Sequence, residues 1–316
     1  MEIDMLDRQV IHALRVNGRA GFRELGAVLG VADQTVARRY RRLREHAALR
    51  VVALPNPITL NQEMWLIRMR SAPDAAMAIA GALARRRDTV WVSLTSGGTE
   101  ISCSVRVPAA ADWESLLLEK LPRTPRLISV TAHCLIHQFT GGATGPDNRD
   151  AALTPEQAAA LTPERLPGTT TLTDTDQPLI DALAGDGRLG FTELATATGW
   201  PESTVRRRLR ELLGTGALFT DVEIDPESLG FRGRVILWLS VAPSRLAAIG
   251  AALATHEEVV FAAATTGPTN VMVTVICQDM AGFYRYLTER IGSLDGVERV
   301  ESAPLLRHVK QVGTVR

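Results

Sequence analysis

Two short stretches of the chain carry polar and basic side chains at a spacing that suits contact with nucleic acid. The first stretch places Gln34, Arg38 and Arg41 at helical spacing on one face of a helix, with Arg42 beside them. A short polar side chain near the start of a helix can reach base edges, and the arginines after it can bind guanine or phosphate. The positions predicted to contact DNA are Gln34, Thr35, Arg38, Arg41, Arg42, Ser203, Thr204, Arg206, Arg207 and Arg210.

Both stretches belong to an internal repeat. Residues 18–49 and 187–218 align without gaps, and 15 of the 32 positions are identical. In each copy a short amphipathic helix is followed by a glycine, Gly30 or Gly199, that suits a sharp turn, and then by the basic helix. This order predicts a helix-turn-helix. The alternative is an amphipathic surface helix with a solvated basic face. Because the basic helix occurs in both copies, each time after a turn glycine, DNA recognition is favoured over this alternative.

The composition is that of an ordinary globular protein. The 316 residues are 46% hydrophobic and 22% charged, with no net charge, which argues against a uniformly basic binder or a polybasic tail. Cys103, Cys134 and Cys277 are scattered and odd in number, so no disulfide framework is expected and a cytoplasmic location fits. The sequence shows neither a signal peptide nor an apolar run of membrane-spanning length.

The remaining patterns predict a sheet domain in each copy. Residues 6–15 predict a helix that completes the first three-helix unit, and 50–61 and 220–230 predict a wing or connector that leaves each unit. Strand, helix, strand, strand, helix and strand then follow, which is the order of a ferredoxin-like domain. In the first copy these are 64–70, 74–86, 89–95, 100–107, 111–121 and 127–139. In the second copy they are 235–241, 244–255, 259–266, 271–277, 280–291 and 297–309.

The predicted fold class is therefore α+β, a tandem repeat of a helix-turn-helix (winged-helix-like) domain and a ferredoxin-like βαββαβ domain. The helix-turn-helix domains are predicted at 1–61 and 174–230, and the sheet domains at 62–139 and 231–316. A Gly-, Pro-, Thr- and Ala-rich linker occupies 140–173, and Thr154 followed by Pro155 predicts a short capped helix within it.

This order resembles the leucine-responsive regulatory protein/AsnC (Lrp/AsnC) family of transcription regulators. The resemblance is carried by LDRQVIHALRVNGRAGFRELGAVLG, by STVRRRLRELLGTGALF and by the hairpin turns TSGGTE and TTGPTN, and it covers nearly the whole chain twice. It implies two family subunits fused in tandem, a homo-oligomeric assembly, duplex DNA as partner and a small-molecule effector such as an amino acid. The implied effector site lies at the hairpin turns, at Gly97, Thr99, Glu100, Gly267, Thr269 and Asn270, although ordinary turn residues are the alternative interpretation.

The two copies depart from the family pattern and from each other. Ala32 and Pro201 stand where the family usually has Ser or Thr at the start of the recognition helix. Glu211 replaces Arg42, which reverses a charge beside the predicted DNA-facing surface. The sequence therefore predicts half-sites of unequal sequence or affinity, with the first copy holding phosphate more tightly.

Some residues suggest functions other than DNA binding. His133, Cys134 and His137 could suggest a metal site, but alternation along a strand places the cysteine opposite the two histidines. Siroheme decarboxylases share this two-part fold, yet 90–95 and 260–266 lack the His and Arg expected to hold a tetrapyrrole. An oligomerisation module with inactive helix-turn-helices would not need the retained arginines. We therefore expect no enzyme activity, cofactor or metal.

Overall fold

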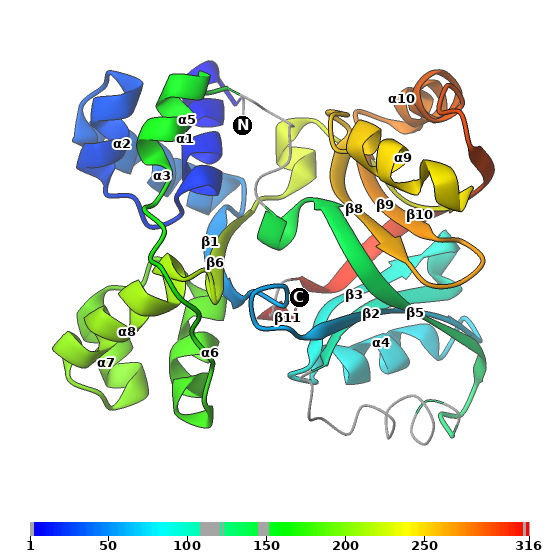
Figure 1. Ribbon diagram of the computed structural model, residues 1–316, viewed down its shortest axis with the longest axis horizontal. Coiled ribbons are helices and arrows are strands. Elements are labelled where there is room, and N and C mark those ends of the chain that lie inside the picture. Colours follow the sequence, from blue (N-terminus) through cyan, green and yellow to red (C-terminus); the bar gives the residue numbers. More distant parts are fainter. Residues whose placement is uncertain (1–2, 108–120, 122, 145–151, 312–313, 316) are drawn as a thin grey trace. The chain divides into compact units, whose positions relative to one another are not determined.

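The computed structural model describes residues 3–107, 121, 123–144, 152–311 and 314–315, which group into two compact units. Residues 1–60 and 148–231 form one, the helix-turn-helix unit, and residues 61–147 and 232–316 form the other, the sheet unit (Figure 1). Each unit thus combines segments from both halves of the chain. None of the helices in the described part of the chain has the length and hydrophobicity needed to cross a membrane.

The helix-turn-helix unit contains two similar three-helix bundles. The first copy consists of α1 (Met5–Val16), α2 (Phe22–Leu29), α3 (Asp33–His46) and β1 (Arg50–Pro55). The second copy consists of α6 (Gln177–Gly185), α7 (Phe191–Thr198), α8 (Glu202–Gly214) and β6 (Leu218–Glu223). Gly30 and Gly199 end α2 and α7 with φ values of 69° and 72°, a left-handed conformation that glycine adopts without steric cost. The predicted turn glycines are confirmed.

Strands β1 and β6 differ from the prediction of a wing or connector leaving each copy. They pair with each other as an antiparallel two-stranded sheet, with Arg50 opposite Glu223 and Pro55 opposite Leu218. The ribbon therefore joins the copies instead of extending from either one. A short strand satisfies its backbone groups only against a partner strand, and the nearest one belongs to the other copy.

A close backbone approach beside this ribbon explains why residue 187 is glycine. The Gly187 amide donates to the Val51 carbonyl over 2.7 Å, and a Cβ at Gly187 would lie 2.7 Å from the Val52 carbonyl carbon. Backbone atoms cannot move aside as a flexible side chain can. We expect Gly187→Ala to lower the free energy of unfolding by about 1–3 kcal/mol in denaturant titrations.

The matched control for this substitution is Gly185→Ala. Gly185 lies in α6, and a Cβ there would meet nothing within 4 Å. Alanine is a better helix former than glycine by about 1 kcal/mol, so this variant should be as stable as the unmodified chain or more stable. Equal stability of the two variants would contradict the close approach at Gly187.

The predicted linker follows the surface of the helix-turn-helix unit. Its helix α5 (Pro155–Leu161) has the predicted Thr154 cap, in which the Thr154 hydroxyl accepts from the Gln157 amide. Leu161 is buried in the core of the first copy, and the Leu166 amide donates to the Gly214 carbonyl of the second copy over 3.0 Å. The segment therefore packs first on one bundle and then on the other.

The sheet unit contains the elements predicted for two ferredoxin-like domains. The first copy supplies β2 (Glu63–Ser71), α4 (Ala76–Ala84), β3 (Thr89–Thr95), β4 (Glu100–Val107) and β5 (Leu127–Thr140). The second copy supplies β7 (Gly233–Val241), α9 (Leu246–Leu253), β8 (Val259–Thr265), β9 (Val271–Cys277), α10 (Met280–Arg285) with a π-helical turn (Tyr286–Ile291), β10 (Val297–Gln311) and β11 (Thr314–Val315). The helix predicted at 111–121 lies outside the described residues, apart from Leu121. The α+β fold class is confirmed.

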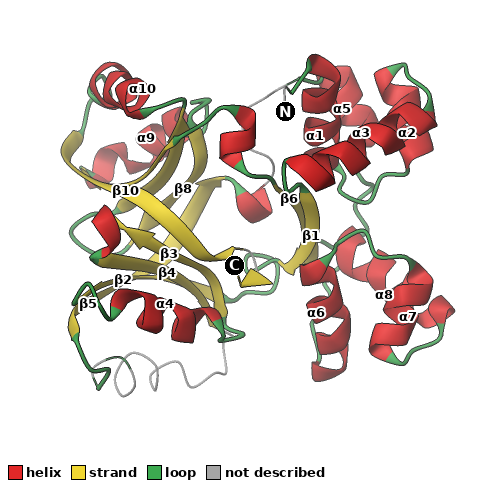
Figure 2. Ribbon diagram, turned by 180° about the vertical axis from the view of Figure 1, so that it is seen from behind, coloured by secondary structure: helices red, strands yellow, loops and turns green. Residues whose placement is uncertain are grey.

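The strands form one 9-stranded sheet in the order β11-β10-β3-β4-β2-β5-β8-β9-β7. Strand β7 also pairs with β10, so the sheet closes on itself (Figure 2). The first half of β5 pairs with β2 and its last residues pair with β8 of the other copy. Strand β10 does the same with β7 and β3. Each copy thus lends the end of its last strand to the other, and the β7–β10 pairing leaves fewer exposed strand edges.

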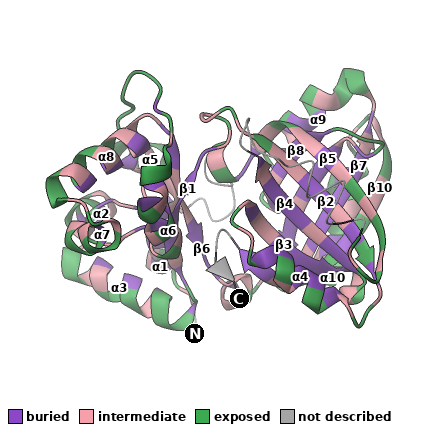
Figure 3. Ribbon diagram, turned by 90° about the horizontal axis from the view of Figure 1, so that it is seen from below, coloured by how far each residue is buried: buried purple, intermediate pink, exposed green. Residues whose placement is uncertain are grey.

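Three apolar clusters fill the sheet unit. One lies between α4 and the first-copy strands and includes Ile67 and Ile101, and the second lies beneath α9 and α10 and includes Leu237 and Phe283. The third contains Trp238 on the opposite side of the strands, where side chains alternate with those beneath the helices. Figure 3 shows that β3 and β4 are largely buried, whereas the helices have exposed outer faces.

Candidate nucleic-acid interface

Helices α3 and α8 each bury one narrow face. In α3 this face is formed by Val36, Tyr40 and Leu43, and in α8 by Val205, Leu209 and Leu212. No side chain caps either helix at Ala32 or Pro201. Apolar packing against the rest of the bundle therefore holds each helix in place, and the opposite face is left for solvent or a ligand.

The arginines of these helices have several environments, and those of the first class are exposed. Arg38 and Arg41 of α3, and Arg207 and Arg210 of α8, are exposed and make no ion pair or hydrogen bond within the described part of the chain. Their guanidinium groups remain available to phosphate or guanine. Gln34 and Ser203 are also exposed, near the start of each helix, whereas Thr35 and Thr204 are half-buried. Helical spacing thus places these predicted contact residues on the outward side of each bundle.

The second class of arginine holds the bundle together. Arg208 donates through Nε and Nη2 to the two carboxylate oxygens of Asp176, over 2.8 and 2.7 Å, and the Asp176 side chain is 1% exposed. At the equivalent place in the first copy, Arg39 donates to Asp7 over 3.3 Å and also pairs with Asp4. A buried carboxylate requires such partners. The sequence analysis did not single out these pairs, although an Asp and an Arg occupy the corresponding positions in both copies.

Arg42 and Glu211 have partners that the sequence analysis did not predict. Arg42 forms an ion pair with buried Asp7, and Glu211 pairs with Arg208 over 3.0 Å and accepts from the Thr170 hydroxyl over 3.0 Å. Both side chains are therefore engaged within their own bundles. Contact of Arg42 with DNA stays a prediction, and in the absence of DNA its charge is shared with an internal carboxylate.

Arg206 has a third environment. It is exposed, but its guanidinium carbon lies 3.9 Å from the centre of the Phe191 ring. This distance suits a cation–π contact, which stabilises the side chain over α7 without neutralising its charge. Arg206 can still contact phosphate in this position. Its counterpart in the first copy is Ala37, so the contact is specific to the second copy.

A reciprocal pair of arginines joins the two bundles. Arg19 donates to the carbonyls of Gly187 and Leu189, and Arg188 donates to the carbonyls of Gly18 and Ala20, the latter over 2.9 Å. Burial lowers the pKa of both Arg19 and Arg188. These contacts and the β1–β6 ribbon hold α3 and α8 within one compact unit.

The predicted effector residues lie on two hairpin turns of the sheet unit, β3–β4 and β8–β9. Gly97, Thr99 and Gly267 are exposed, whereas Thr269 is buried. Glu100 is also buried, and its carboxylate accepts from Arg68 over 2.7 Å and from the Ser96 hydroxyl over 3.1 Å.

The side chain of Asn270 binds the backbone of β7. It accepts from the Val241 amide over 2.9 Å and donates to the Val241 carbonyl over 2.8 Å. The polar groups of Glu100 and Asn270 are thus already satisfied by the protein. Ligand contacts at these turns would fall first on the exposed backbone and on Thr99.

Arg68 connects the two copies inside the sheet unit. It pairs with Glu100 and with Glu301 of β10, and its guanidinium carbon lies 4.9 Å from the centre of the Trp238 ring. Burial alone would lower the pKa of Arg68, but the hydrogen bonds and charges of the two glutamates outweigh burial and raise it. The sequence analysis missed Arg68, whose partners come from strands far apart in the chain.

The histidines of β5 have separate environments. His133 is buried, and its Nδ1 lies 2.7 Å from the Thr266 carbonyl oxygen, whereas His137 is exposed. Within the described residues, no group of three or more His, Cys, Asp or Glu side chains is placed to hold a metal ion.

Comparison with known proteins places these features in context. The model of the AsnC-type helix-turn-helix domain matches residues 3–44 and 172–213, and that of the Lrp/AsnC ligand binding domain matches 234–315. The HTH-type transcriptional regulator FL11 of Pyrococcus horikoshii is 30% identical over 142 residues, which cover 44% of this chain and 93% of FL11. LrpA of Pyrococcus abyssi, also an HTH-type transcriptional regulator, is 28% identical over 43% of this chain and 96% of its own.

Solved structures of a siroheme decarboxylase match the two copies together. The siroheme decarboxylase NirDL, in complex with an iron-uroporphyrin III analogue, aligns over 98% of this chain and 93% of its own with a TM-score of 0.65. The sequence identity is 12%, so the similarity concerns the fold. Each regulator of Pyrococcus instead matches about half of this chain, as expected for a fusion of two such subunits.

Proposed function

Because this chain belongs to the Lrp/AsnC family of transcriptional regulators, we propose that it binds specific duplex DNA in the cytoplasm through both recognition helices, α3 and α8. The observation that carries this proposal is the sorting of arginines on these helices. Those on the inner sides pair with Asp7 and Asp176, whereas Arg38, Arg41, Arg207 and Arg210 have no partner in the described chain. Residues needed only for folding would not include four exposed, unpaired arginines at equivalent places.

The two recognition helices differ, so the proposed site is not a perfect palindrome. Gln34 can donate and accept in two places on adenine, whereas Ser203 at the equivalent position cannot. Arg206 replaces Ala37 and adds a positive charge to α8. Operator symmetry follows protein symmetry, so we expect two half-sites of different sequence within one site.

Selection from a pool of random duplexes tests this proposal. Repeated rounds of binding to the full chain should enrich one bipartite sequence whose two halves differ. The Arg38→Ala variant should lose enrichment of one half and the Arg207→Ala variant that of the other. A pool that remains random with the unmodified chain would refute sequence-specific binding.

The second part of the proposal is control by a small metabolite, such as an amino acid, at the hairpin turns. Its support is the match of the second sheet domain to the family's ligand-binding domain and the exposure of Gly97, Thr99 and Gly267. A ligand at 100 times its dissociation constant should stabilise the folded chain by about 2.7 kcal/mol. A thermal-shift screen of amino acids in which the melting temperature never rises would count against this part.

A further inference from the structure

A polar cleft of about 450 Å³, which the sequence did not predict, lies along α8. It is lined in part by Thr169, Thr171, Trp200, Thr204, Arg207 and Arg208. Thr204 and Arg207 belong to the outward side of the recognition helix. The threonines at 169–175 belong to the segment that precedes α6. The cleft therefore connects the proposed DNA-facing surface to the end of the linker.

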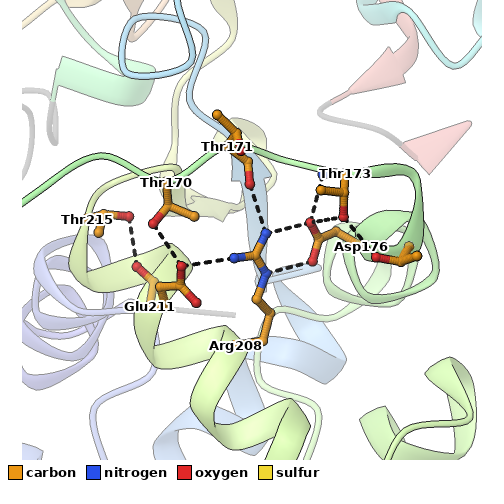
Figure 4. Close-up of polar contacts among 8 residues, drawn as sticks. Thr170, Thr171, Thr173, Asp176, Arg208, Glu211 and Thr215 are labelled. Atoms are coloured by element: carbon orange, nitrogen blue, oxygen red, sulfur yellow. Dashed lines mark hydrogen bonds and ion pairs between the residues drawn. The ribbon is translucent and has the colours of Figure 1, made fainter.

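The polar groups on the inner wall of this cleft already have hydrogen-bond or ion-pair partners within the protein. Arg208 lies between the carboxylates of Asp176 and Glu211, and its Nη2 also donates to the Thr171 carbonyl over 2.8 Å (Figure 4). The Thr170 hydroxyl donates to Glu211 over 3.0 Å. These bonds fasten the threonine segment to α8, so its outer side chains are held in place before any ligand arrives.

The outer wall has unused hydrogen-bonding groups. The hydroxyls of Thr169, Thr171 and Thr204 and the guanidinium of Arg207 have no partner among the residues that the structure describes. The four charged groups of the cleft, two arginines and two carboxylates, sum to no net charge. Such a site suits a ligand with one negative charge and several acceptor oxygens better than it suits a dianion.

We infer that this cleft binds one phosphodiester group of the DNA backbone through its threonine hydroxyls, next to the base-reading side chain of Arg207. This inference rests on the proposed function, since it adds a backbone contact at the edge of the α8 half-site. Hydroxyls, arginines and backbone amides are the usual donors to DNA phosphates, and such contacts fix the register of a protein on the duplex.

The first copy has different residues at the equivalent positions. Asp4 and Leu6 take the places of Thr173 and Thr175, and Val31 takes the place of Trp200. Asp4 pairs with Arg39 and brings a negative charge to that side of α3. The cleft is therefore a feature of the second copy, and the extra phosphate contact belongs to the half-site of α8.

The test combines a double variant with modified DNA. Thr169→Val with Thr171→Val removes two hydroxyls and keeps the shape of both side chains, and we expect binding of the selected duplex to weaken about tenfold. A series of duplexes, each with one methylphosphonate, removes one backbone charge at a time. With the unmodified chain, one position in the α8 half-site should weaken binding, and with the double variant the same position should have little further effect.

The control is Thr131→Val, which changes an exposed threonine of β5 and should bind every duplex as the unmodified chain does. Equal sensitivity of the double variant and the unmodified chain at every methylphosphonate position would overturn the cleft assignment and leave the proposed function intact. Failure of the unmodified chain to bind any duplex would overturn both. Inorganic phosphate at constant ionic strength should release DNA from the unmodified chain by competing for the cleft, and this effect should be lost in the double variant.

Discussion

Replacing Asp176 with alanine is expected to lower the free energy of unfolding by about 3 kcal/mol. The carboxylate is 1% exposed and accepts from Arg208 and from the amide and hydroxyl of Thr173. Its loss leaves a half-buried guanidinium with Glu211 as its remaining carboxylate partner. Urea denaturation followed by circular dichroism measures the change. Asp174→Ala is the matched control, because Asp174 is exposed on the same turn and should change stability by less than about 0.5 kcal/mol. Equal stability of the two variants would contradict a structural role for the Asp176–Arg208 pair.

The same ion pair predicts the direction of a pH effect. Burial alone would raise the pKa of Asp176, but hydrogen bonds from Arg208 and Thr173 outweigh it and the net shift is downward. A carboxyl group whose pKa is lower in the folded chain stabilises folding above its unfolded pKa of about 3.9. This contribution is lost as the pH falls through the folded pKa. The stability difference between the unmodified chain and Asp176→Ala should therefore shrink in acid and stay constant near neutral pH.

Replacing Arg38 or Arg207 with alanine is expected to weaken binding to the selected duplex by about 1–3 kcal/mol each. Both side chains are exposed and unpaired within the described chain, so the variants should unfold at the same denaturant concentration as the unmodified protein. Footprinting should show protection lost mainly at one half-site for each variant.

The control for these variants is Arg87→Ala, which removes an exposed arginine of the sheet unit and should leave DNA affinity unchanged. Equal losses at both halves of a perfect palindrome would contradict distinct roles for α3 and α8. A loss for Arg87→Ala as large as that for Arg207→Ala would show that overall charge, and not position, determines binding.

Local features of the fold could be predicted from sequence because they depend on neighbouring residues. Gly30 and Gly199 marked the turns, Thr154 with Pro155 marked the start of α5, and alternating apolar residues marked β3, β4 and β9. The exchange of the ends of β5 and β10 could not be predicted in this way. Each copy contains a complete βαββαβ pattern, and nothing in that pattern says which copy a strand end will pair with.

The candidate site was predictable only in part for a related reason. Helical spacing separates Arg38 from the buried face but does not reveal that the next arginine, Arg39, meets Asp7 of another helix. The recurrence of an Asp and an Arg at equal separation, as Asp7 with Arg39 and Asp176 with Arg208, is the signal that could have found these pairs. The role of Arg68 required knowledge of the closed sheet, because Glu301 reaches it from the other copy.

The salt dependence of DNA binding tests the central claim most directly. Each arginine that neutralises a phosphate releases condensed counterions, so the logarithm of the binding constant should fall steeply with the logarithm of salt concentration. Fluorescence anisotropy with the selected duplex should give a slope that becomes less steep by about 0.9 for each of Arg41→Ala and Arg210→Ala, if these side chains contact phosphate. Arg87→Ala should keep the original slope. A slope near zero for the unmodified chain, or the same slope for all four proteins, would contradict binding through the exposed arginines of α3 and α8.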